Sequence, residues 1–378
     1  MRTFSAFSHL AVMIFAQLAH ALSLNDVCDW LRLKARAVLA WGVTPPSRNN
    51  LSHANKGRSA SFIETVFWRT LEHLQRSEPF FGTRRPGGGA RRLLHRFKVR
   101  LHAVDSTVME LVAQCMDWAK HRRRKAAAKL HLRLGLNGFL PSFALVDTAG
   151  EHDNKRAREL CAGLAEGEVV IFDKAYVDFA HLHELDVRGV QWVTRAREKM
   201  DWRALKNLRP DKKSGILKDQ LVRLCGPRWQ KYKGWRLRRV EAWVEVDGAP
   251  KLMVFLTNNK EWSPRSVCDL YRARWEIEVF FKQVKQTLKL SGFLGYSANA
   301  IRWQVWAALL VYVLLRFCGH LSAWGHSFTR LFAVVRAALW ERLHLLMLLR
   351  RYGTAGGSFL LLGAAHTAWL PGFEPPPT

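Results

Sequence analysis

Residues 169–173 read Val-Val-Ile-Phe-Asp. Four consecutive apolar residues, without the alternation of a half-exposed strand, predict a strand that is buried on both faces of a sheet. The run places a carboxylate, Asp173, at the end of that strand. Acidic residues are scarce in this chain, with 31 Asp and Glu residues against 59 Lys and Arg residues, so this position calls for a functional or structural reason.

Three strands are predicted before the buried one. The first alternates over residues 99–104 and ends at Asp105, the second covers Lys129 to Leu134, and the third covers Phe139 to Val146. Asn137-Gly138, between the last two, is a strong hairpin signal. The three strands are therefore expected to form a meander.

A helix is predicted over residues 155–164, before the buried strand, and another over residues 179–185, after it. A further strand is predicted over residues 190–194. With a final long helix, this order of elements resembles that of a ribonuclease-H-like domain. The predicted fold class is α/β, with a ribonuclease-H-like mixed sheet.

Residues 196–259 are rich in Trp and Lys and contain a second hairpin signal, Asp247-Gly248, so they predict a β-rich insertion. The long helix then begins after Ser263, a favoured N-cap residue, with Pro264 in the first helical position, where its missing N–H costs nothing. It is expected to end near Leu290.

A small all-α domain is predicted before the sheet. Ser23 and Asp26 form a capping box at the start of one helix, and Ser47 is placed to cap a short basic helix over residues 48–58. A further helix follows over residues 62–74. An amphipathic helix that includes Phe7 to Ala21 precedes these three. The four helices indicate either a small DNA-binding domain or a helical adaptor with a solvated basic loop, and the sequence leaves both open.

These predictions divide the chain into segments. Apolar helices are expected to follow the catalytic domain at its C-terminal side. The predicted organisation is a helical N-terminal domain at 1–83, a basic Gly-rich linker at 84–97, a catalytic domain at 98–195 and 260–349, the insertion at 196–259, and a flexible tail at 350–378.

The formal net charge is +28, and the basic residues are spread along the whole chain. Such an excess calls for a polyanionic partner, and nucleic acid fits best because neutralised phosphates release their counterions. A basic membrane-surface protein is the alternative. The apolar runs at 1–24 and 306–315 are respectively amphipathic and too short to cross a bilayer, so no membrane segment is predicted.

The six cysteines include no C-x-x-C pair, which suggests neither a zinc site nor a disulfide framework. A reducing compartment is the simplest location, so a cytoplasmic, nucleoid-associated protein is expected.

Asp105 and Asp173 both follow predicted apolar strands. Carboxylates are the hard ligands that Mg²⁺ prefers, and two such ions can activate the attacking oxygen and stabilise the leaving oxygen in phosphoryl transfer. Each Asp taken alone is more often a turn or helix cap. The pair gains weight only with a third carboxylate.

The long helix supplies a candidate. Tyr271, Arg274, Glu278, Lys282 and Lys285 recur at spacings of three and four and form one polar stripe. Glu278 is the preferred third carboxylate. The alternative is a salt-bridged amphipathic helix in which Glu278 pairs with Arg274 and Lys282, and spacing alone does not decide between them.

The same helix carries a resemblance. Tyr271, Arg274, Glu278 and Lys285 are similar to the Tyr-(2)-Arg-(3)-Glu-(6)-Lys signature of the insertion-sequence-four family of DDE transposases. The family's first Asp corresponds to Asp105. Its second corresponds to Asp173, in a run that resembles the usual Asp-Arg-Gly-Tyr but has Lys174-Ala175 at the two middle positions.

The resemblance implies a transposase that cuts DNA at the terminal inverted repeats of an insertion sequence and transfers the strands, by cut-and-paste transposition. Asp105, Asp173 and Glu278 would bind two Mg²⁺ ions, for which Mn²⁺ can substitute. The partners would be double-stranded DNA and a second copy of the chain in a synaptic complex. The implied DNA contacts are Tyr271, Arg274, Lys282, Lys285, Lys174 and Tyr176.

Two alternatives to an active transposase stay open. One is a catalytically inactive DNA-binding relative that acts as a repressor, and the other is a ribonuclease-H-like nuclease without strand transfer. A Trp of the insertion, such as Trp229, Trp235 or Trp243, is a candidate to stack on a flipped base. Each of the three is also an ordinary core or surface aromatic on the simpler interpretation.

Overall fold

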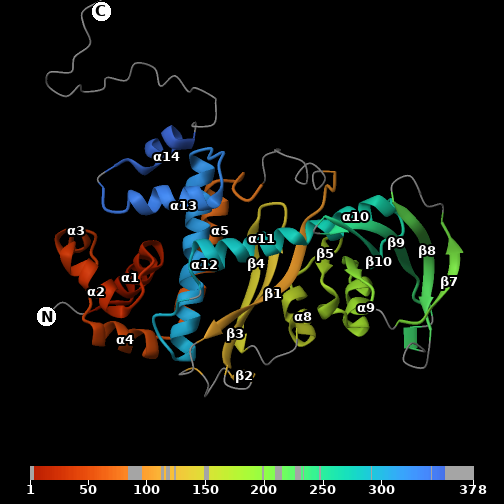
Figure 1. Ribbon diagram of the computed structural model, residues 1–378, viewed down its shortest axis with the longest axis horizontal. Coiled ribbons are helices and arrows are strands. Elements are labelled where there is room, and N and C mark those ends of the chain that lie inside the picture. Colours follow the sequence, from red (N-terminus) through yellow and green to blue (C-terminus); the bar gives the residue numbers. More distant parts are fainter. Residues whose placement is uncertain are drawn as a thin grey trace, which may run out of the picture. The chain divides into compact units, whose positions relative to one another are not determined.

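The fold is taken from a computed structural model (Figure 1). Two compact units are present, Met1–Val313 and Leu314–Thr378. The residues that the structure describes are 4–83, 96–111, 115, 120–122, 125–148, 153–197, 200–208, 215–225, 231–232, 234–246, 248–290, 292–341 and 343–353.

A mixed sheet forms the centre of the first unit. Strands β1 (Leu101–Leu111), β5 (Val169–Phe172) and β6 (Gln191–Arg195) run parallel, β3 (Lys125–Gly135) is antiparallel to β1, and β4 (Leu140–Thr148) is antiparallel to β3. The short β2 (Lys120–Arg122) pairs with β3. This order confirms the predicted ribonuclease-H-like α/β fold and its meander.

The end of β1 differs from the prediction. Strand β1 does not end at Asp105 but continues to Leu111, paired with β3 along its length. Asp105 therefore lies within a strand, where the sheet fixes its direction.

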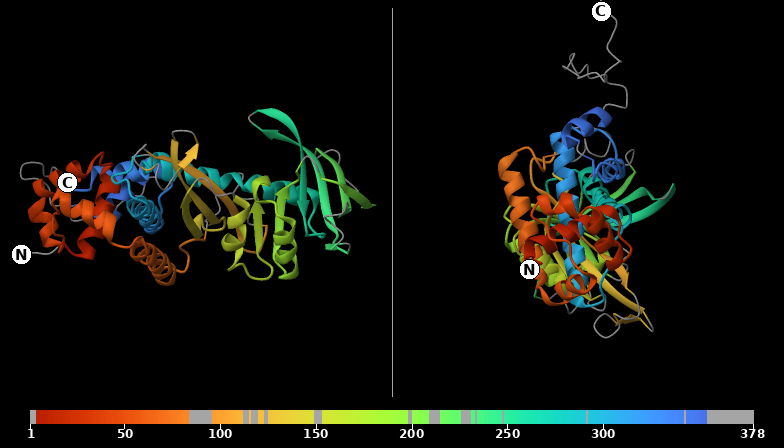
Figure 2. Two further views of the ribbon diagram at one scale, coloured as in Figure 1. Left: turned by 90° about the horizontal axis from the view of Figure 1, so that it is seen from below. Right: turned by 90° about the vertical axis from the view of Figure 1, so that its left-hand side faces the viewer.

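The β-rich segment continues the same sheet. Strands β7 (Trp202–Asn207), β8 (Ile216–Leu224), β9 (Leu237–Val246) and β10 (Ala249–Thr257) pair in sequence order, and β10 is also antiparallel to β6. The β9–β10 hairpin turns at the predicted place, where Gly248 has a φ of +77° that glycine adopts readily. Figure 2 shows these strands continuing from the central ones.

Helices cover both faces of the central sheet. Helices α8 (Asp153–Cys161) and α9 (Phe179–Val187) pack on a core that includes Val104 and Phe172. Successive side chains of a strand point to opposite faces, so Asp105 points to the other face. That face is covered by α10 (Pro264–Ala273), α11 (Trp275–Lys282) and a π-helical turn, Gln283–Thr287.

Among the described residues, the helices before the sheet are α1 (Ala6–Ala19), α2 (Leu24–Leu33), α3 (Ala35–Ala40), α4 (Arg48–Gly57) and α5 (Ala60–Ser77). The capping box of Ser23 and Asp26 is confirmed at the start of α2. The Ser47 hydroxyl accepts a hydrogen bond from the Asn50 N–H, so Ser47 caps α4 as predicted.

Helix α12 (Ala298–Leu321) is longer than the apolar run that the sequence indicated. Within the described residues α12 has the length and composition of a membrane span, but 61% of its most apolar segment is buried. Helices α1 and α2 meet the same criteria only when taken together, and they are bent by 101° relative to each other. The core helix of a globular protein has the same properties, so this is weak support for a span.

The second unit is described on its own. It contains the end of α12, α13 (Phe328–Ala337), which the Ser327 hydroxyl caps, and α14 (Leu345–Gly353). Residues 350–353 of the predicted tail thus close a helix. Residues 354–378, like residues 84–95 of the predicted linker, lie outside the described residues.

Candidate active site

Two of the three predicted carboxylates come from neighbouring parallel strands. The register pairs Val104 of β1 with Phe172 of β5. Asp105 and Asp173 each follow one member of this pair, so the sheet itself sets them side by side. The Ser106 N–H donates to Asp105 Oδ1 at 2.8 Å and helps to fix that carboxylate.

The third carboxylate comes from the helical segment that crosses this face. The helix predicted over 263–290 starts as expected, since Ser263 accepts from the Ser266 N–H and Pro264 follows. Its α-helical pattern is interrupted at Arg274, between α10 and α11, and it ends in the π-helical turn. Such π-turns are frequent at functional sites.

Arg274 joins the first and third carboxylates. Its Nη1 lies 2.8 Å from Asp105 Oδ2, and its Nη2 lies 2.7 Å from Glu278 Oε1. The arginine side chain is only 9% exposed, and its Nε is buried without a hydrogen-bond partner among the described residues. The predicted salt bridge of Glu278 with Arg274 is therefore present, and it brings Glu278 to Asp105 instead of turning it away from the sheet.

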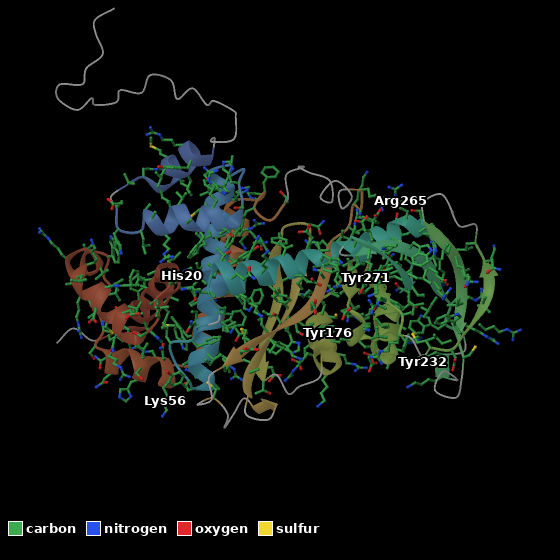
Figure 3. The ribbon with its side chains drawn as sticks, in the orientation of Figure 1. His20, Lys56, Tyr176, Tyr232, Arg265 and Tyr271 are labelled. Atoms are coloured by element: carbon green, nitrogen blue, oxygen red, sulfur yellow. The ribbon has the colours of Figure 1, made fainter. Side chains whose placement is uncertain are left out.

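Tyr271 and Lys285 also contact the sheet. The Tyr271 hydroxyl donates to Asp173 Oδ1 at 3.3 Å, and burial raises the pKa of this phenol. Lys285 Nζ donates to the Val108 carbonyl oxygen at 2.9 Å and lies 3.4 Å from Thr107 Oγ1. Figure 3 labels Tyr271 on α10.

Negative charge is concentrated around Asp105. Its pKa is raised to about 6, first by burial and then by the carboxylates of Asp173 and Glu278, although Arg274 and the Ser106 N–H act in the opposite direction. Burial is the main cause of the raised pKa, and Arg274 has a larger effect than either neighbouring carboxylate. A crowded set of hard oxygen ligands fits a divalent cation.

The carboxylates are not gathered into a compact ligand cluster. Among the described residues, no group of three or more His, Cys, Asp or Glu side chains is arranged to hold a metal ion. At this site Arg274 bonds to both Asp105 and Glu278. A metal ion that binds both must displace the guanidinium.

The other predicted DNA contacts differ in exposure. Lys174 and Lys282 are exposed, as a DNA contact requires. Tyr176 is not: it is 1% exposed, and its hydroxyl lies 3.3 Å from His131 Nδ1. The predicted contact of Tyr176 with DNA is therefore corrected, because its side chain packs on the α8–α9 face of the sheet, opposite to Asp105.

The candidate tryptophans also differ in exposure. Trp235 is 7% exposed and its N–H donates to Asp186, so it is a core residue. Trp243, on β9, is 51% exposed. Trp229 lies outside the described residues.

Thr107 was not singled out from the sequence. It lies two residues after Asp105 on β1, on the same face, and approaches Lys285. The period of two along a strand is the signal that places it there.

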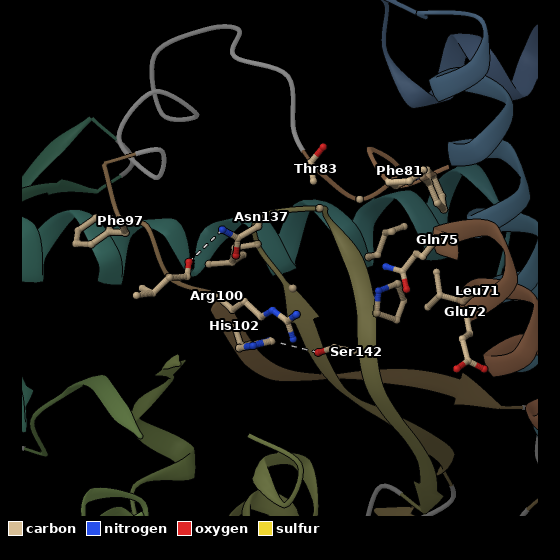
Figure 4. A pocket seen from close by; sticks show the side chains of 18 of the residues that line it. Leu71, Glu72, Gln75, Phe81, Thr83, Phe97, Arg100, His102, Asn137 and Ser142 are labelled. Carbon is tan, nitrogen blue, oxygen red and sulfur yellow. Dashed lines mark hydrogen bonds between the residues drawn. The ribbon is translucent and has the colours of Figure 1, made fainter. Parts of the chain in front are cut away.

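A cavity of about 930 Å³ lies elsewhere, between α5, the start of β1 and the β3–β4 hairpin (Figure 4). Its lining includes His102, whose pKa is lowered to about 4, chiefly by burial. None of the three carboxylates lines it. The carboxylate site is thus separate from this cavity.

Comparisons with known proteins identify the family of the chain. The chain matches the family model described as a transposase DDE domain over residues 98–314, and one described as a domain of unknown function (DUF4372) over residues 1–43. It is 28% identical over 301 residues to a putative transposase, y4zB, from Sinorhizobium fredii, across 79% of this chain and 78% of that protein.

Two more distant proteins are similar over other lengths. The transposase InsG for insertion sequence element IS4 from Escherichia coli is 21% identical over 193 residues, 50% of this chain and 43% of that protein. A structure of the piggyBac transposase synaptic complex with hairpin DNA aligns with a TM-score of 0.45 and 10% identity, over 93% of this chain and 73% of that one. Because the DDE model spans more than half of the chain, this protein belongs to the family of transposases with a DDE domain.

Proposed function

We propose that this transposase cuts DNA at the terminal inverted repeats of its insertion sequence and joins the freed 3′ ends to target DNA. The observation that carries the proposal is the convergence of Asp105, Asp173 and Glu278, from β1, the end of β5 and α11, on the paired side chains of Arg274 and Tyr271.

The three carboxylates would hold two Mg²⁺ ions, and Mn²⁺ can substitute. Such ions, when bound, activate the attacking oxygen and stabilise the leaving oxygen of a phosphodiester. The proximity of Asp105 to Glu278 through Arg274, and of Asp173 to Asp105 on the neighbouring strand, supports this assignment.

The cations of the helix would position the DNA backbone. Arg274 can bind a phosphate through two hydrogen bonds once it leaves the carboxylates. Lys285, next to a later part of β1, supplies a single positive charge. The exposed Lys174 and Lys282 would contact phosphates at the rim. Trp243 is the exposed candidate to stack on a flipped base.

An insertion sequence has two ends that must be held together, so we propose that two copies of the chain act on DNA in one synaptic complex. Each would supply its own set of carboxylates.

The test is cleavage of a labelled duplex that carries the ends of the DNA flanking this gene, with Mg²⁺, Mn²⁺ or EDTA. Asp105→Ala, Asp173→Ala and Glu278→Ala are each expected to abolish metal-dependent cuts and to leave duplex binding in place. Glu276→Ala is the matched control, because it removes a carboxylate two residues away on another face of α11. Cleavage that persists in the three variants would reject the site.

The fate of the cut strand separates strand transfer from simple cleavage. Wild-type protein is expected to join the labelled 3′ end to an added plasmid. Cuts without joined product would indicate a nuclease, and binding without any cut would indicate an inactive relative.

A further inference from the structure

Helix α4 exposes a continuous polar surface. Its outward side chains include no hydrophobic residue, whereas Leu51, Ala54 and Asn55 face inward and are buried. Amide, imidazole, ammonium and guanidinium groups make up most of this surface. The exposed side chains are Arg48, Asn49, Asn50, Ser52, His53 and Lys56, which we call the α4 face.

Polar contacts hold the inner side of α4 in place. His9 Nε2 lies 2.8 Å from Asn55 Oδ1. Asn299 Nδ2 donates to the carbonyl oxygens of Asn55 at 2.8 Å and Arg58 at 2.7 Å, and Trp303 Nε1 donates to the Arg58 oxygen at 2.7 Å. These donors satisfy carbonyl groups near the C-terminal end of the helix, which would otherwise lack partners. The α4 face is thus presented from a fixed support.

The stretch of chain that contains α4 has an excess of basic residues, and Asp29, just before this stretch, pairs with Arg32. From Trp30 to Ile63 the chain contains six Lys and Arg residues and no Asp or Glu. The six are Arg32, Lys34, Arg36, Arg48, Lys56 and Arg58, and all but the half-buried Arg58 are exposed. Duplex DNA carries one negative charge per about 1.7 Å of its axis, so the complementary partner is a polyanion of this kind.

The dimensions and side-chain types of α4 match a major groove. A helix of 10 residues is about 15 Å long, and the groove, about 12 Å wide, admits a helix. Asn side chains pair with adenine edges, and Lys and Arg pair with guanine edges. An anion-binding surface without base recognition would need only the cations, yet Asn49, Asn50 and His53 occupy the middle of the α4 face.

We propose that α4 enters the major groove of duplex DNA, where Asn49, Asn50 and His53 contact base edges and Arg48 and Lys56 contact the flanking phosphates. Figure 3 labels Lys56 at α4. Helix α4 lies between the two family matches, residues 1–43 and 98–314, and belongs to neither. This proposal rests on the proposed function in one respect: the DNA sequence that α4 recognises is taken to be the ends of the insertion sequence.

The test compares binding to two fluorescent duplexes by anisotropy, in EDTA. One carries an end of the DNA that flanks the gene, and the other carries the same bases in shuffled order. An Asn50→Ala/His53→Ala double variant is expected to lose the preference for the end duplex by about 10-fold or more, since each base contact contributes about 1–3 kcal/mol. A double variant of exposed residues on α5, His73→Ala/Gln75→Ala, is the matched control and should keep the preference.

A second measurement separates phosphate contacts from base contacts. Lys56→Ala is expected to weaken both duplexes equally and to lower the slope of log affinity against log salt by about one unit. Preference for the end duplex that survives in the Asn50→Ala/His53→Ala variant would overturn the proposal, as would equal binding of both duplexes by wild type.

Failure of the α4 proposal can be distinguished from failure of the proposed function. The Glu278→Ala variant should keep the preference for the end duplex while it loses cleavage. If α4 is not the reader, preference survives in the α4 variant; if the carboxylates are not the active site, cleavage survives in Glu278→Ala.

Discussion

Replacing Arg274 with Gln is expected to strengthen Mn²⁺ binding to the DNA-free protein. In the structure the guanidinium occupies oxygens of both Asp105 and Glu278. An ion that takes these oxygens as ligands has to break at least one of the two contacts. Arg274→Gln removes this competition and the positive charge, and it keeps a polar, though shorter, side chain.

The magnitude follows from the more buried contact. Glu278 is 41% exposed and its pairing is screened by water, whereas Asp105 is 19% exposed, so we count only the bond to Asp105. A hydrogen bond between charged groups contributes about 1.5–3 kcal/mol. Because about 1.4 kcal/mol is a factor of ten, the dissociation constant of Mn²⁺ should fall by about 10- to 100-fold.

Electron paramagnetic resonance of free Mn²⁺ measures this constant directly, without DNA and without turnover. Asp105→Asn should lose tight binding, which ties the bound ion to the proposed site. Lys282→Gln is the charge control, since it removes an exposed cation from the same helical segment and should change the constant by less than about threefold, as expected of a screened surface charge. Equal constants for wild type and Arg274→Gln, or equal gains in Arg274→Gln and Lys282→Gln, would refute the competition.

Three further predictions concern stability. Asp219→Ala leaves Arg238 buried without its carboxylate, 2.7 Å away, and should lower the free energy of unfolding by about 3–5 kcal/mol in urea; a loss below about 1 kcal/mol would contradict this. Burial lowers the pKa of His9 from 6.5 to about 4, so the contribution of neutral His9 to stability is complete above pH 6.5 and declines as pH falls toward 4. His9→Leu should flatten the plot of unfolding free energy against pH between these values. An unchanged plot would show that His9 does not cause this pH dependence. A Cβ on Gly138 would clash with the Gly82 carbonyl oxygen, so Gly138→Ala should lower the free energy of unfolding by about 1–3 kcal/mol. An unchanged melting temperature would show that the segments around Gly82 and Gly138 can move apart at little cost.

Local signals in the sequence predicted much of the fold. The apolar run at 169–172 is β5 with the same bounds, and Ser23, Ser47 and Ser263 cap helices as expected. Each of these features depends on a few neighbouring residues. The true length of β1 was missed because the polar run that begins at Asp105 resembles a turn, whereas in the structure these side chains take strand positions beside the site.

Long-range pairing could not be predicted in this way. The β-rich segment shows where its own hairpin turns, but only the pairing of β10 with β6 makes it an extension of the central sheet. The direction of Tyr176 depends likewise on the turn after Asp173, which the sequence motif does not specify. The motif suggested a DNA contact, and the turn instead directs the ring into the core.

The spacing of the signature helix has a structural role beside its chemical one. Tyr271 contacts Asp173 after β5, Arg274 contacts Asp105 in β1, and Lys285 contacts Val108 further along β1. The segment from Tyr271 to Lys285 thus braces the middle of β1 and the end of β5 over about 20 Å, at about 1.5 Å per residue. Glu278 lies between these contacts, and its side chain is 41% exposed. Tyr271, Arg274 and Lys285 fix the helix to the sheet, whereas Glu278 remains partly accessible to an incoming ion. Substitutions at Tyr271 or Lys285 should therefore alter catalysis partly by moving Glu278.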